Sequence, residues 1–170
     1  MKKLPILLLV FGLTFYVTQT HINVPKPPTI VIMGDEDFRQ DIQYALKVIN
    51  ETKSTAHLVD AIKHTGKTVY IVQDSVKSFC GVPKSDFLKS MYGKPLDSYV
   101  HIGNDFDAPI YLVLAHEMQH ALDFAQGTFN PDTNKVRPGV SGIEDKAMTL
   151  ENAMEKELGL PVRLRHDGKI

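Results

Sequence analysis

The chain has 170 residues, of which 43% are hydrophobic and 23% charged, a composition typical of a single globular domain. Its 19 basic and 20 acidic residues give a net charge of −1, which argues against a dedicated nucleic-acid-binding protein because such proteins carry a basic excess. Cys80 is the only cysteine, which excludes an intrachain disulfide and a cysteine-rich zinc finger. We interpret it as a small buried hydrophobic residue rather than a nucleophile.

The first twenty residues have the pattern of an export signal. Two lysines precede an apolar run that ends at Val17, which is short for a membrane-spanning helix of about 20 residues. We expect residues 1–20 to be a signal peptide, with an uncleaved membrane anchor as the alternative. Residues 21–28 are rich in proline and predict a linker, so the folded domain would comprise residues 29–170.

The first half of this domain alternates strand and helix patterns. Residues 29–34 are rich in β-branched side chains and predict a strand. Asp35 is placed to cap the helix that follows, because apolar residues then recur at helical spacing. A second helix is predicted at about residues 54–64, ended by Gly66, and residues 67–73 predict the next strand.

The second half is dominated by helix patterns. Residues 74–96 predict a loop with at most one short helix, and the polar–apolar alternation of residues 98–104 predicts an edge strand. Asp107 could cap a helix that runs to about Ala125, and a last helix is predicted at residues 143–158. Strands therefore lie early and helices late, which favours the α+β class.

Residues 112–123 read LVLAHEMQHALD and contain an H-E-x-x-H pattern formed by His116, Glu117 and His120. Positions i and i+4 lie on one face of a helix, so both imidazoles can bind one metal ion, and Glu117 can take a proton from a metal-activated water. An amphipathic helix with two surface histidines is the other interpretation. The largely apolar surroundings disfavour it, because burying these polar side chains without a ligand is costly.

A zinc site built on this pair needs a third protein ligand. Glu144 and Glu151 are seven residues apart, so they share one face of the last predicted helix. We expect Glu144 to be the ligand, with Glu151 as the alternative; if Glu144 binds the metal, Glu151 becomes a candidate for holding a ligand histidine. Asp123 could orient His120, although we favour a solvent-exposed acid at the helix end.

Three blocks of the sequence resemble the NleD-like zinc metallopeptidases, a family of type III effectors and toxin domains of polymorphic secretion systems. They are the strand, helix, helix, strand opening at residues 30–71, the LVLAHEMQHALD stretch, and the closing EDKAMTLENAMEKELGLPVRLRH at residues 144–166. The second block occurs in many metallopeptidases, whereas the third block and the order of all three are more specific.

The resemblance implies a zincin-like α+β metallopeptidase domain that binds Zn²⁺ through the two motif histidines and Glu144, with Glu117 as the general base. The family usually has a tyrosine three residues after an arginine near its end. Here His166 follows Arg163 by three, so His166 is a second catalytic candidate, as a donor to the developing oxyanion, with Arg163 as the alternative donor. A solvated basic tail is the other interpretation of these two residues.

We therefore expect a monomeric zinc endopeptidase, exported to the periplasm or secreted, or else anchored by its N-terminal segment. Its partner would be a protein or peptide substrate that pairs with the strand at residues 98–104; no nucleic acid and no other membrane contact is expected. The alternative is a non-catalytic zinc-binding or interaction protein whose site is closed by a fourth ligand such as His101 or His166. A toxin directed at a bacterial competitor would still be a peptidase, with a different target.

Overall fold

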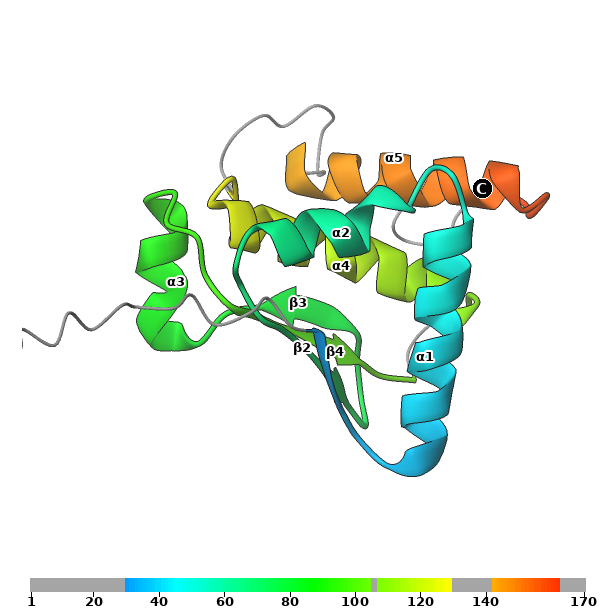
Figure 1. Ribbon diagram of the computed structural model, residues 1–170, viewed down its shortest axis with the longest axis horizontal. Helices are drawn as coiled ribbons and strands as arrows, with labels where there is room; N and C mark the ends of the chain where they lie inside the picture. The colour runs from blue at the N-terminus through cyan, green and yellow to red at the C-terminus, as the bar shows by residue number, and fades with distance from the viewer. Residues whose placement is uncertain (1–29, 105–106, 130–141, 163–170) are drawn as a thin grey trace, which may run out of the picture.

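The computed structural model of the protein describes residues 30–104, 107–129 and 142–162. Within these ranges four strands form one sheet, accompanied by five helices (Figure 1). The strands are β1 (Ile30–Met33), β2 (Val69–Gln73), β3 (Phe79–Gly81) and β4 (Ser98–Ile102). The helices are α1 (Glu36–Glu51), α2 (His57–His64), α3 (Lys84–Met91), α4 (Ile110–Gln126) and α5 (Gly142–Glu157). This combination confirms the predicted α+β class.

The sheet has the strand order β1-β2-β4-β3, in which β1, β2 and β4 run parallel and β3 is antiparallel to β4. In Figure 1, α2, α4 and α5 lie on the same side of the sheet. Side chains alternate between the two faces of a strand, and those on the helix side are buried: Val69 and Ile71 from β2, Val100 and Ile102 from β4. The core therefore lies between this face of the sheet and the helices.

The cap of α1 is the one that the sequence predicts. The backbone N–H of Phe38 donates a hydrogen bond to Asp35 Oδ1 at 2.9 Å, as an N-cap residue requires. From there Phe38, Ile42, Ala45 and Ile49 form a buried stripe at helical spacing. The capping carboxylate and the apolar stripe together account for the position and orientation of this helix.

β4 is an interior strand, so the prediction of an edge strand at residues 98–104 is wrong. Val100 pairs with Ile71 of β2 on one side and with Cys80 of β3 on the other. Its polar–apolar alternation arises because side chains on only one face of the sheet are fully buried, which affects interior and edge strands alike. β3 lies in the segment at residues 74–96 that was predicted to be loop, since three residues ending in glycine are too few for a strand pattern.

α4 is the central helix of the domain. Every residue from Leu112 to Ala125 is buried, because the helix packs against the sheet, α1, α2 and α5. α4 begins at Ile110 after Pro109, and no side chain makes a capping hydrogen bond, so the predicted capping role of Asp107 is wrong. Proline is favoured at a helix start because its missing N–H has no partner to lose there. The helix ends at Gly127, which adopts a left-handed φ of 70°.

Residues 1–29 lie outside the described residues, and so do the predicted export signal and the proline-rich linker. The domain boundary at residue 29 likewise stays a prediction. Among the helices that the structure describes, none combines the length and the apolar composition needed to cross a membrane.

Candidate metal centre

The two motif histidines project from the same face of α4. His116 and His120 are each 6% exposed, and their ring centroids lie 4.9 Å apart. This proximity follows from their spacing, because residues four apart on a helix are neighbours one turn away. α5 packs against α4 (Figure 1). The first turn of α5 carries Glu144. Two segments distant in the sequence thus meet at the histidines.

Three side chains converge on one point. His116 Nε2 lies 3.3 Å from one carboxylate oxygen of Glu144, and His120 Nε2 lies 3.4 Å from the other. The two Nε2 atoms are 3.2 Å apart. A cation bound between the two rings could take a lone pair from each Nε2 atom. His116, His120 and Glu144 could therefore hold a metal ion.

Glu151 lies on the other side of the His116 ring. Its Oε2 atom is 3.2 Å from His116 Nδ1, and the residue is 9% exposed. A carboxylate can only accept a hydrogen bond, so His116 Nδ1 carries the proton. In the neutral ring Nε2 is then the nitrogen that can bind a metal ion. The structure thus brings both predicted acids to the histidines, Glu144 to the two Nε2 atoms and Glu151 to the opposite nitrogen of one ring.

Glu117 follows His116 on α4 and is 8% exposed. Its negative charge also affects Cys80 on the neighbouring strand β3. Burial raises the pKa of the Cys80 thiol well above its ordinary value, and the charge of Glu117 raises it further. The thiol therefore stays protonated at neutral pH, which disfavours a nucleophilic role for Cys80.

Asp123 is buried, so the interpretation of this residue as a solvent-exposed acid is wrong. It is 3% exposed, and its carboxylate forms an ion pair with Lys146 on α5. The physical reason is that α5 covers the end of α4 and supplies a cation there. Nothing in the local sequence signals this contact, because its two residues are 23 positions apart.

Of the two predicted fourth ligands, only His101 lies among the described residues, and it is not part of the cluster. His101 Nδ1 lies 3.3 Å from Asp74 Oδ2, and its ring stacks on Phe79 with centroids 4.3 Å apart. His166 falls outside the described residues. Within the part of the chain that is described, the histidine and acid cluster contains three residues and no fourth.

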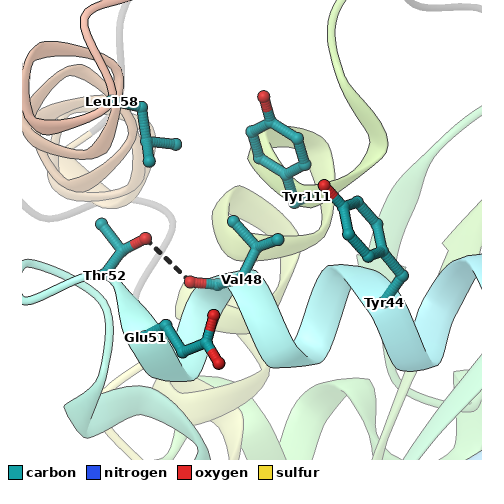
Figure 2. A pocket seen from close by; sticks show the side chains of 6 residues that line it. All are labelled: Tyr44, Val48, Glu51, Thr52, Tyr111 and Leu158. Atoms are coloured by element: carbon teal, nitrogen blue, oxygen red, sulfur yellow. Dashed lines mark hydrogen bonds between the residues drawn. The ribbon is translucent and has the colours of Figure 1, made fainter.

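A pocket of about 300 Å³ lies elsewhere, between α1, the start of α4 and the end of α5 (Figure 2). It is lined by Tyr44, Val48, Glu51, Thr52, Tyr111 and Leu158. None of these residues belongs to the cluster around His116, so the concavity and the candidate chemistry are separate features of the domain.

A family model of effector proteins, peptidase family M91, matches residues 26–142. The match contains all four strands and the whole of α4 with its H-E-x-x-H motif, whereas Glu144 and Glu151 lie just beyond it. The assignment of these two acids to the site therefore rests on geometry. No curated protein sequence and no solved structure matches the chain. Because the family match spans more than half of the chain, the protein belongs to the NleD-like M91 family of effector metallopeptidases.

Proposed function

We propose that the protein is a zinc-dependent endopeptidase that hydrolyses peptide bonds of a protein substrate, with Glu117 as the general base. The observation that carries the proposal is the convergence of His116 Nε2, His120 Nε2 and the Glu144 carboxylate at separations of 3.2, 3.3 and 3.4 Å. Membership of a peptidase family supports the hydrolytic activity.

The donor set favours zinc. A tetrahedral zinc ion with bonds of about 2.0–2.1 Å requires ligand atoms about 3.3–3.4 Å apart. The two Nε2 atoms, 3.2 Å apart, come close to this separation, and Glu144 presents one carboxylate oxygen to each of them. Two imidazole nitrogens suit zinc, whereas magnesium and calcium prefer oxygen ligands alone. Three protein ligands would leave one position open, the arrangement of catalytic rather than structural zinc sites. A zinc ion held by His116, His120 and Glu144 would supply a Lewis acid that makes a water molecule acidic enough to attack at neutral pH.

Glu117 handles the proton in this proposal. Its carboxylate accepts a proton from the attacking water as the water oxygen bonds to the scissile carbonyl carbon. It then delivers that proton to the amide nitrogen as the C–N bond breaks, which releases a carboxylic acid and an amine. Glu117 is 8% exposed and directly follows the candidate ligand His116 on α4, which supports the role. Glu151, whose carboxylate contacts His116 Nδ1, would hold this ring in place as a ligand.

We propose that the substrate binds as an extended strand along β3. This strand ends the sheet and packs against α4, and its outer edge has no strand partner among the described residues. Free backbone N–H and C=O groups on such an edge can pair with a peptide of almost any sequence. The prediction that placed the substrate on residues 98–104 moves to β3, because both edges of β4 are occupied.

The proposal keeps three further expectations from the sequence. His166 is the candidate donor to the oxyanion, and residues 1–20 direct export to the periplasm or the medium or anchor the chain in a membrane. The protein acts as a monomer.

The non-catalytic alternative needs a closed metal site, and His101, one of its two candidate ligands, lies with Asp74 instead.

The proposed role of Glu117 can be tested with a mixed peptide library. We expect the wild-type chain to cleave internal bonds of the library, and Glu117→Gln to lower the rate at least about 100-fold, because glutamine cannot accept the proton. Mass spectrometry of the products gives rates and cut positions, and metal content and melting temperature of the variant serve as controls. Cleavage at the wild-type rate by Glu117→Gln would show that another group is the base.

A further inference from the structure

A second polar contact joins α4 to α5, beyond the candidate metal ligands. Asp123 lies near the end of α4, and its Oδ1 atom accepts a hydrogen bond from the Lys146 ammonium group on α5. Thr128 Oγ1 and Gln119 Nε2 lie 3.2 and 3.4 Å from the same oxygen. The carboxylate thus collects donors from α5, from α4 itself and from the turn that follows α4.

The stability of α4 itself does not explain why Asp123 lies at this position. A negative charge near the C-terminal end of a helix is unfavourable, because the carbonyl groups there carry partial negative charge. Burial makes this worse, since the Asp123 side chain is only 5% exposed. The cation on Lys146 offsets both costs, while its own side chain is 51% exposed and so loses little hydration. The two residues are therefore suited to holding the helices together.

The ion pair lies close to the candidate metal centre on both helices. Lys146 follows Glu144 by two residues on α5, and Asp123 follows His120 by three on α4. At about 1.5 Å of rise per residue, these intervals correspond to roughly 3 Å and 4.5 Å along the helix axes. Both helices are rigid over less than one turn, so sliding α5 along α4 would move Glu144 with Lys146. Metal–ligand distances tolerate only about 0.2 Å of error.

We propose that Asp123 and Lys146 are positioning residues that fix α5 on α4 so that Glu144 reaches the Nε2 atoms of His116 and His120. The inference rests on the proposed metal site and adds the device that assembles it. Neither residue belongs to the group of candidate metal ligands. Their effect is on the population of chains in which the third ligand is already in place before the metal arrives.

Zinc affinity of the full chain, measured by competition with a chromophoric chelator, tests this role. We expect Lys146→Met and Asp123→Asn each to weaken zinc binding about ten-fold or more, as loss of residues that orient metal ligands generally does. The double variant should bind no more weakly than the poorer single variant, because both changes remove one contact. Lys146→Arg should restore most of the affinity, since it keeps the charge and the donor. Lys156→Met, a change at an exposed lysine on the same helix, is the matched control.

Melting of the metal-free proteins in chelator separates positioning from general stability. A merely structural role predicts a lower melting temperature for the variants with zinc affinity equal to that of Lys156→Met, and this result would overturn the proposal. If Asp123→Asn fails to fold, the pair Lys146→Met and Lys146→Arg decides alone. If every variant binds zinc as tightly as the wild-type chain does, the positioning role is overturned and the proposed function stays intact. A wild-type chain that binds no zinc overturns both.

Discussion

Each histidine of the candidate centre presents one nitrogen to the shared point and the other to its surroundings. For His116 the surroundings are Glu151, whose carboxylate accepts from Nδ1, so that Nε2 is the nitrogen that faces the shared point. His120 Nδ1 is buried and has no hydrogen-bond partner among the described residues. Only one of the two imidazoles therefore has its proton placed by a neighbouring carboxylate, which makes Glu151 the residue whose loss should disturb the site most without removing a ligand.

Replacing Glu151 with alanine should weaken zinc binding by about 10–100-fold, because His116 loses the group that sets its tautomer and ring orientation. Glutamine at this position should lose less, since its amide oxygen still accepts from Nδ1. Isothermal titration with zinc measures both variants against the wild type. Equal affinity in all three proteins would show that Glu151 does not support the ligand.

Some of the site could be predicted residue by residue and some could not. His116, Glu117 and His120 follow from spacing on one helix, and the face shared by Glu144 and Glu151 made both acids candidates for the third ligand. The partners of Asp123 could not be predicted, because the ion pair with Lys146 depends on how two helices cross. Helix periodicity gives the face on which a side chain lies but not its neighbour on another element.

At the scale of elements, α4 depends on a turn in which its C-terminal glycine meets another segment of backbone. Gly127 has a φ of 70°, and a Cβ atom at this position would lie 2.4 Å from the carbonyl oxygen of Gly93. Gly159, after α5, has a φ of 69° but nothing within 4 Å of such a Cβ atom. The two glycines share a backbone conformation and differ in their surroundings.

Alanine at Gly159 should destabilise the protein by about 1 kcal/mol, the cost of the left-handed conformation for a residue with a Cβ atom. Alanine at Gly127 should cost clearly more, because the backbone of Gly93 must also shift. Thermal unfolding of the two variants against the wild type gives the comparison. Equal decreases in the free energy of unfolding would show that the close approach of Gly93 to Gly127 does not affect stability.

Prediction of the elements succeeded for the long amphipathic helices. It failed for β3 and for the interior position of β4 in the sheet. α1 follows from an apolar stripe and a capping aspartate, which are local signals. β3 has three residues and no such signal, and its pairing with β4 is a contact between segments separated by α3. The position of β4 inside the sheet follows from that pairing, so one missed strand also moved the proposed substrate edge.

The whole molecule places a buried motif helix between a sheet and the helix that supplies the third candidate ligand. Composition and the order of patterns were enough to predict an α+β domain, and the family match agrees with the resemblance carried by the motif. The match ends at residue 142, so the contribution of α5 is known only from the way this helix packs on α4. The central claim is accordingly that α4 and α5 together form one metal site.

Elemental analysis of the purified full chain tests that claim most directly, because it needs no substrate. We predict about one zinc ion per wild-type chain and close to none in His120→Ala or Glu144→Ala, since a site with three protein ligands loses its metal when one is removed. His101→Ala should keep the metal, because His101 pairs with Asp74 outside the cluster. A wild-type chain without metal, or a Glu144→Ala variant that retains zinc at the wild-type ratio, would contradict the account.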